Sequence, residues 1–155
     1  MTNEKHEMLL DLLSTAYNME LETVCNYLSQ SMNLDGFKAK HIKDALAMDI
    51  QEELGHATLL AKRIKVLEGT VPGSQSLKMT QDAMQPNGDA LDVVAVIEGV
   101  IAAEQGAVEH YRKIIDAANG VDPVTEDLAI TIMGDEEEHR RLFKGFLAEV
   151  EAGSR

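Results

Sequence analysis

The stretch that decides the fold is residues 129–147, AITIMGDEEEHRRLFKGFL, in which a glutamate and a histidine interrupt an apolar helical stripe. Glu136 and His139 are three residues apart, so on a helix both side chains project from one face. Ile132 precedes Glu136 on that face, and Phe143 follows it. A carboxylate in a core stripe is costly unless something compensates its charge. The stretch therefore predicts a buried helix that carries a charge-compensated polar site.

A second stretch repeats this arrangement. Glu53-Leu54-Gly55-His56 has the same spacing, and Leu46, Ile50 and Leu60 share its face. One Glu-x-x-His motif is weak evidence, because chance supplies about half a match in a chain of this composition. Two such motifs, each inside an apolar stripe, favour a paired site over two coincidences.

Two further glutamates lie in apolar stripes elsewhere in the chain. Glu20 has Leu13 and Val24 on its face, and Glu104 has Ile97 and Val108. Each of four helical segments thus places one glutamate on its buried side.

The four segments with helical periodicity are residues 4–33, 37–68, 89–118 and 123–151. Gly36 and Gly120 lie in the first and third breaks, Gly69 follows the second helix, and Asp122 precedes Pro123 as an N-cap does. The connection 69–88 is long enough to span a bundle. We expect an all-α, antiparallel four-helix bundle with a long crossover between helices two and three, forming a single domain over residues 1–155.

The spacings bring the glutamates to one level of this bundle. Glu20 and Glu53 are 33 residues apart around a turn at Gly36, and Glu104 and Glu136 are 32 apart around Gly120. Each glutamate then lies about 24 Å from its turn, given a rise of about 1.5 Å per residue. Tyrosines follow the same near-repeat, because Tyr27 and Tyr111 each come seven residues after a glutamate.

Four carboxylates in a dry core repel one another or take up protons. Two divalent cations would cancel the four charges, and two neutral imidazoles would complete the coordination. Mixed oxygen and nitrogen ligands suit iron or manganese, and zinc also fits. A single cysteine, Cys25, excludes an iron–sulfur cluster built on several thiolates within the chain.

Composition and net charge limit the binding partners and the cellular compartment that we expect. The net charge of −13 disfavours nucleic acid and anionic membrane surfaces as partners. No stretch has the length and apolarity of a membrane span, and nothing resembles a signal peptide. With one cysteine, no internal disulfide forms, so we expect a cytoplasmic protein.

These residues resemble those of the ferritin-like di-iron carboxylate proteins, which carry one Glu on each of two helices and Glu-x-x-His on the other two. Within that superfamily the chain is most similar to bacterioferritin. The matching stretches are Met19-Glu20-Leu21, Asn26-Tyr27, Ile50 to His56, Val66-Leu67-Glu68-Gly69, Glu104-Gln105-Gly106-Ala107 and Asp135-Glu136-Glu137-Glu138-His139.

The resemblance implies a role for each residue of the site. Glu53 and Glu136 would bridge two metal ions, Glu20 and Glu104 would be terminal ligands, and His56 and His139 would each bind one ion. Tyr27 would hydrogen-bond a ligand or donate an electron. Asp135 would orient one histidine, and Glu52, longer than the family's Asp, would orient the other.

Two departures from bacterioferritin concern haem and assembly. Leu54 stands where that family has the haem-binding Met, so no haem is expected. The short fifth helix of the 24-subunit ferritins is not expected after His139. A homo-oligomer is predicted, whether a dimer, a 12-mer or a 24-mer.

The resulting functional hypothesis is a ferroxidase for iron storage or detoxification, which oxidises two Fe(II) ions with O2 or H2O2. Two alternatives stay open at this point. One is a di-iron or di-manganese peroxidase or oxidase similar to rubrerythrin. The other is a metal-free helical interaction module.

Overall fold

The structure, a computed structural model, describes residues 2–153, which form four long α-helices and two short 3-10 helices. The long helices are α1 (Asn3–Asn33), α2 (Lys40–Val66), α3 (Val93–Ala118) and α4 (Pro123–Gly153). The 3-10 helix η1 (Phe37–Ala39) leads into α2, and η2 (Ser74–Ser76) lies between α2 and α3. The predicted all-α four-helix bundle is confirmed.

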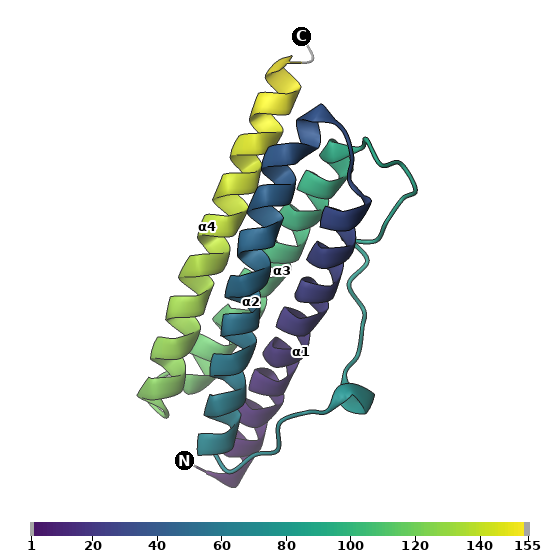
Figure 1. The fold of residues 1–155 in the computed structure, drawn as a ribbon. Helices are drawn as coiled ribbons and strands as arrows, with labels where there is room; N and C mark the ends of the chain where they lie inside the picture. The colour runs from purple at the N-terminus through teal and green to yellow at the C-terminus, as the bar shows by residue number, and fades with distance from the viewer. Residues whose placement is uncertain (1, 154–155) are drawn as a thin grey trace.

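The helices pair as two hairpins joined by a crossover, as Figure 1 shows. α1 packs mainly on α2, and α3 packs mainly on α4. The connection from α2 to α3 runs back along the bundle beside α1, so that α2 and α3 point in the same direction (Figure 1). The predicted long crossover between helices two and three is therefore present.

Hydrogen bonds from α1 hold the crossover against the bundle. The Glu22 carboxylate accepts a hydrogen bond of 2.5 Å from the backbone N–H of Gln81, and the Gln30 side-chain amide donates one of 2.8 Å to the carbonyl of Met84. The Met84 side chain is buried. It lies against Gly99 on α3, where a Cβ atom would collide with crossover backbone. The crossover is thus packed as part of the core.

Two apolar clusters fill the bundle, one towards each end. The first includes Leu34, Ile42, Leu46, Ile97, Val100 and Phe143, and the second includes Leu13, Leu60, Ile64, Ile114, Ala129 and Ile132. Tyr27 belongs to the first cluster and Tyr111 to the second. Between these clusters lies a layer of buried acids and histidines, which forms the site described below.

The start of α3 differs from the prediction. The helix begins at Val93 and not at Asp89, because Asp92 is its N-cap and accepts a hydrogen bond of 3.0 Å from the backbone N–H of Ala95. Asp89 instead accepts a hydrogen bond from the backbone N–H of Leu91, within the loop. Two acids near a helix start compete for the cap, and the sequence alone did not separate them.

The end of α2 also differs. The helix was predicted to reach Glu68 but stops at Val66, and Glu68 takes a left-handed conformation with φ of 62°. The N–H of Gly69 bonds to the carbonyl of Ile64, and that of Glu68 bonds to Lys65, which is the Schellman pattern. Gly69 is needed for space, because a Cβ there would lie 2.6 Å from the Leu10 side chain.

Within residues 2–153, none of the helices combines the length and the apolar character that crossing a membrane requires.

Candidate metal centre

All six residues predicted as ligands come together in the layer between the two apolar clusters. They are Glu20 from α1, Glu53 and His56 from α2, Glu104 from α3, and Glu136 and His139 from α4. None of them is more than 5% exposed. The apolar stripes that carry these residues force the carboxylates inward, since turning them out would expose the core.

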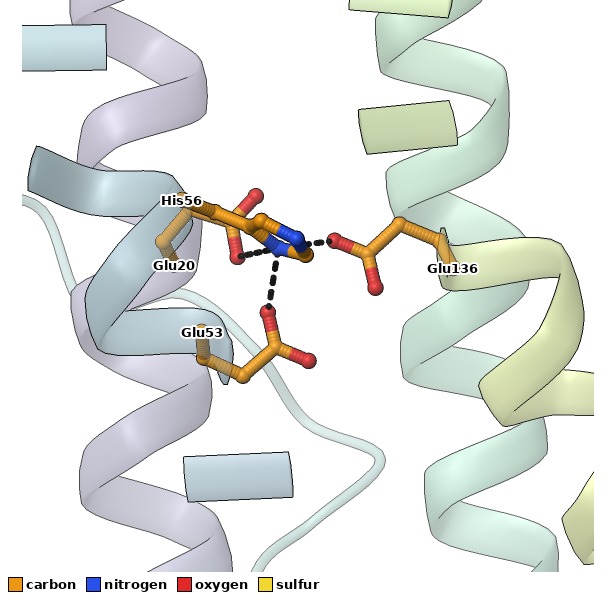
Figure 2. A group of neighbouring side chains, drawn as sticks. All are labelled: Glu20, Glu53, His56 and Glu136. Carbon is orange, nitrogen blue, oxygen red and sulfur yellow. Dashed lines mark ion pairs between the residues drawn. The ribbon is translucent and has the colours of Figure 1, made fainter. Parts of the chain in front are cut away.

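His56 marks one half of the centre. Its Nδ1 atom lies 3.2 Å from Glu136 Oε1, 3.4 Å from Glu53 Oε2 and 3.9 Å from Glu20 Oε2. Figure 2 shows these side chains pointing towards one another from three helices. One carboxylate oxygen from each glutamate and one ring nitrogen thus surround a common point.

His139 marks the other half. Its Nδ1 atom lies 3.1 Å from Glu136 Oε2, 3.2 Å from Glu53 Oε1 and 3.7 Å from Glu104 Oε1. Glu53 and Glu136 therefore serve both halves, each with one oxygen per half. The histidine ring centroids are 6.4 Å apart. Two shared carboxylates thus lie between two ring nitrogens, an arrangement with the donor atoms for two metal ions.

Several atoms at this centre have no hydrogen-bond partner among the described residues. They are Glu53 Oε1, both carboxylate oxygens of Glu136, and Nδ1 of His56 and of His139. The contacts of 3.1–3.2 Å between these atoms do not meet hydrogen-bond geometry. A buried polar atom left unpaired costs about 1–3 kcal/mol. The donor set, oxygen-rich with one imidazole per half, fits two divalent transition-metal ions placed at those points.

The outer nitrogens of both histidines are held by acids. His56 Nε2 donates to Asp135 Oδ2 at 3.1 Å, and His139 Nε2 donates to Glu52 Oε2 at 2.6 Å. Asp135 directly precedes Glu136 on α4 but holds His56 on α2. Glu52 directly precedes Glu53 on α2 but holds His139 on α4. A carboxylate on Nε2 keeps the proton there in the neutral ring and leaves the Nδ1 lone pair directed inward.

Two tyrosines, Tyr27 and Tyr111, hydrogen-bond to Glu104 and Glu20 in a reciprocal arrangement. Tyr27 on α1 donates a hydrogen bond to Glu104 on α3, and Tyr111 on α3 donates one to Glu20 on α1. Both rings are fully buried. The matched spacing of tyrosine and glutamate in the sequence was the signal for this symmetry, although it did not show that the bonds cross between helices.

The pKa values at the centre are shifted because ionisable groups are buried close to one another. Burial raises the pKa of Glu20 to about 8, and Glu53 adds to the rise while His56 opposes it. Burial also raises the pKa of Glu104 well above its usual value. Burial lowers the pKa of His56 and His139, but the surrounding carboxylates outweigh it and raise both well above their usual range. Without cations, protons therefore balance the charge here.

Asp49 is an acid that the sequence reasoning missed. It is 4% exposed, lies one turn before Glu53 on α2, and places Oδ1 3.7 Å from His139 Nε2. Burial raises the pKa of Asp49 to about 6. Its spacing of four residues from Glu53 was the available signal, but that spacing fits a helix edge exposed to solvent equally well.

Comparisons with known proteins find similarity over most of the chain. The family model for the ferritin-like domain matches residues 10–152. A Pyrococcus furiosus protein named DNA protection during starvation protein is 30% identical over 145 residues, covering 91% of this chain and 77% of that protein.

Solved structures are also similar to the chain over most of its length. The bacterioferritin-related protein from Bacteroides fragilis, described as a dodecameric thioferritin, is 26% identical with a TM-score of 0.84, covering 96% of this chain and 89% of that one. A structure of ferritin-like diiron-carboxylate proteins from Bacillus anthracis is 21% identical with a TM-score of 0.83, covering 95% and 99%. The latter likeness concerns the fold alone.

Proposed function

Because this chain belongs to the family of the ferritin-like domain, we propose that it is a dinuclear iron ferroxidase that stores or detoxifies iron. One observation carries the proposal: Glu53 and Glu136 each offer one oxygen to His56 and the other to His139. Two Fe(II) ions in these positions would share two carboxylates and sit close enough to deliver two electrons together.

Each residue has a defined part in binding the substrate Fe(II). Glu53 and Glu136 bridge, Glu20 with His56 completes one position, and Glu104 with His139 completes the other. Four carboxylates balance two divalent ions, so the loaded centre is neutral and stable in a dry layer. Manganese or zinc fits the same donor set, but zinc has no redox chemistry.

The reaction balances with either oxidant. Two Fe(II) ions give one electron each, and O2 with two protons becomes H2O2. With H2O2 as the oxidant, two electrons and two protons give two water molecules. The protein's own contribution is to hold both ions in register, to limit water in the layer, and to exchange protons through its acids and histidines as charge changes.

Tyr27 and Tyr111 position the terminal carboxylates. Their hydrogen bonds to Glu104 and Glu20 occupy one oxygen of each glutamate, which restricts the rotation of the carboxyl group. Tyr27 is in addition a candidate electron donor, since its hydroxyl is one hydrogen bond from the centre.

The name of the Pyrococcus furiosus relative supports a protective role. Removing Fe(II) together with peroxide prevents the formation of radicals that damage DNA, so protection needs no DNA contact. The net charge of −13 favours this chemical route over coating of the nucleic acid. A mobility-shift assay at low salt is expected to show no complex with duplex DNA.

Storage requires a closed shell, and we infer that copies of this chain assemble into one. The Bacteroides fragilis relative is described as dodecameric. Apolar side chains exposed on this chain, including Phe37, Met48 and Leu91, offer surface for such contacts. Light scattering after size-exclusion chromatography is expected to give a mass of many subunits, whereas a monomer would contradict storage.

The activity test follows Fe(III) absorbance after Fe(II)-loaded, oxygen-free protein is exposed to air. We expect oxidation much faster than in buffer, and loss of that acceleration in the Glu53→Gln, Glu136→Gln double variant. The Glu137→Gln, Glu149→Gln double variant removes the same charge from two exposed positions of α4 and should retain it. Oxidation no faster than in buffer would overturn the proposal, as would full activity in the double variant.

A further inference from the structure

A cavity of about 680 Å³ lies between α1, the crossover and α3, and none of the six residues of the paired centre lines it. Its lining residues on α1 recur at intervals of three and four, so they share one face of the helix. They are Asp11, Ser14, Thr15, Asn18, Met19 and Glu22. Cavities of roughly 300–1,000 Å³ hold small organic molecules. The cavity therefore has the size of a ligand site.

The crossover is fixed beside this space by α1. The Asn18 side chain donates a hydrogen bond to the backbone carbonyl of Lys78 and accepts one from the backbone N–H of the same residue. The lining residues of α3 are small, namely Ala102, Ala103 and Gly106. A Cβ atom at Gly106 would meet no side chain and no other element within 4 Å. The space in front of Gly106 therefore stays open.

Carboxylates outnumber basic groups around the cavity. Asp11, Glu22 and Asp82 line it, whereas Lys78 is the one basic residue among the lining residues. None of the three acids forms an ion pair within residues 2–153. The lining therefore carries a net negative charge that the protein itself does not neutralise.

Glu22 is the innermost of these acids, since it is 5% exposed whereas Asp11 and Asp82 are exposed. Glu22 Oε1 accepts a hydrogen bond from the backbone N–H of Gln81, but Oε2 has no partner among the described residues. A buried carboxylate is costly unless hydrogen-bond donors or a positive charge compensate it. The free oxygen thus favours a ligand that carries a cationic donor.

The acids are spread along the cavity and do not converge on one point. Asp11 and Glu22 are eleven residues apart, which is about 16 Å along a helix that rises about 1.5 Å per residue. Neither they nor Asp82 belong to a cluster of three metal-ligating side chains in the part of the chain that the structure describes. Separated negative charges match a molecule with separated cationic groups better than a single metal ion, and they repel anionic ligands.

We propose that this cavity binds a linear aliphatic polyamine. One ammonium group donates to Glu22 Oε2, and a second lies towards Asp11. The methylene chain between them packs on Met19 and Ala103. An ammonium group has three donors and no acceptor, which suits a carboxylate at each end. The bound molecule contacts α1, the crossover and α3 together, so it holds the crossover on the bundle.

The test titrates spermidine into the metal-free protein by isothermal titration calorimetry at low salt. We expect one saturable site per chain. Glu22→Gln keeps an acceptor for the Gln81 N–H but removes the charge, so it should weaken binding about tenfold or more. Glu149→Gln removes the same charge from an exposed position of α4 and should bind spermidine as the wild type does.

A second matched pair tests the cavity from α3. Gly106→Lys places a tethered ammonium group in the cavity and should abolish spermidine binding. Gly145→Lys adds the same charge at an exposed glycine of α4, where a Cβ atom also meets nothing, and should retain binding. Gly106→Lys leaves the bond from Glu22 to the crossover intact, so the two pairs are independent. Thermal melting of each variant checks that the fold is kept.

The outcomes separate a built site from attraction to the net charge. Absence of a saturable site in the wild type would overturn the proposal, as would equal binding by the two members of either pair. Neither result would bear on the paired centre, because the titration contains no metal ion.

Discussion

Tyr27 on α1 donates its hydroxyl hydrogen to the carboxylate of Glu104 on α3, across the buried layer that the two helices share. The reverse bond, from Tyr111 on α3 to Glu20 on α1, completes a reciprocal pair. These bonds tie one hairpin to the other at the level of the site. Each helix thus turns its glutamate into the layer, and a tyrosine of the other hairpin holds the carboxyl group there.

Replacing either tyrosine by phenylalanine is expected to weaken Fe(II) binding by a similar factor, because each change removes the same hydrogen bond to a terminal glutamate. The free energy of unfolding of the metal-free protein should fall by about 1–3 kcal/mol in each variant, as a buried carboxylate oxygen loses its partner. Titration and denaturant melts give the two quantities. A far slower oxidation in Tyr27→Phe than in Tyr111→Phe would show that Tyr27 also donates an electron.

Metal ions are expected to stabilise the fold through the paired centre. At a free Co(II) concentration about 100 times the dissociation constant, binding to the native state alone adds about 2.7 kcal/mol. The difference in melting temperature between loaded and chelator-treated protein should be large in the wild type and small in Glu136→Gln. Because each protein is its own reference, a shift in the metal-free baseline does not affect the comparison. An equal gain in both proteins would contradict the assigned role of Glu136.

The metal-free protein is expected to lose stability as the pH rises from about 5 to 8. Burial raises the pKa of Glu20 to about 8 and that of Asp49 to about 6, so the native state keeps protons that the unfolded chain has released. Stability is then fully present at low pH and falls by up to about 1.4 kcal/mol per pH unit for each such proton. Denaturant melts in chelator measure the slope, and Glu20→Gln should flatten it. A stability that rises over this range would contradict the charge balance described here.

The end of α2 gives a prediction independent of metal. Glu68 is exposed and has φ of 62°, so Glu68→Gly should raise the free energy of unfolding by up to about 1 kcal/mol, because glycine removes the strain of the left-handed conformation. Gly69→Ala should lower it by about 1–3 kcal/mol, since the new methyl group meets Leu10 and Ile64. Thermal melting of the Glu68→Gly and Gly69→Ala variants measures both changes. Opposite signs would contradict both the strain at Glu68 and the close approach at Gly69.

The sequence predicted the layer of acids and histidines because period and spacing alone determine it. Glu20 and Glu104 lie on apolar faces at matched distances from their turns, and the helices leave them no other place to point. Asp135 and Glu52 came from the resemblance, which did not say which histidine each would orient. The structure places Asp135 against His56 and Glu52 against His139.

Features that depend on contacts between helices were not predictable in this way. Asp49 lies at the edge of its stripe, and the structure buries it beside His139 of α4. The choice of Asp92 over Asp89 as a cap depends on where the crossover ends. Gly69 was assigned a conformational role, whereas its requirement comes from Leu10 on the neighbouring helix.

We propose that one buried layer holds two iron ions between shared glutamates. Anomalous diffraction at the iron edge, from crystals loaded with Fe(II) without oxygen, tests it most directly. We predict one iron peak among Glu20, Glu53, His56 and Glu136, and a second among Glu53, Glu104, Glu136 and His139. A layer without iron in fully loaded crystals, or a single ion that leaves His56 or His139 unliganded, would contradict the account.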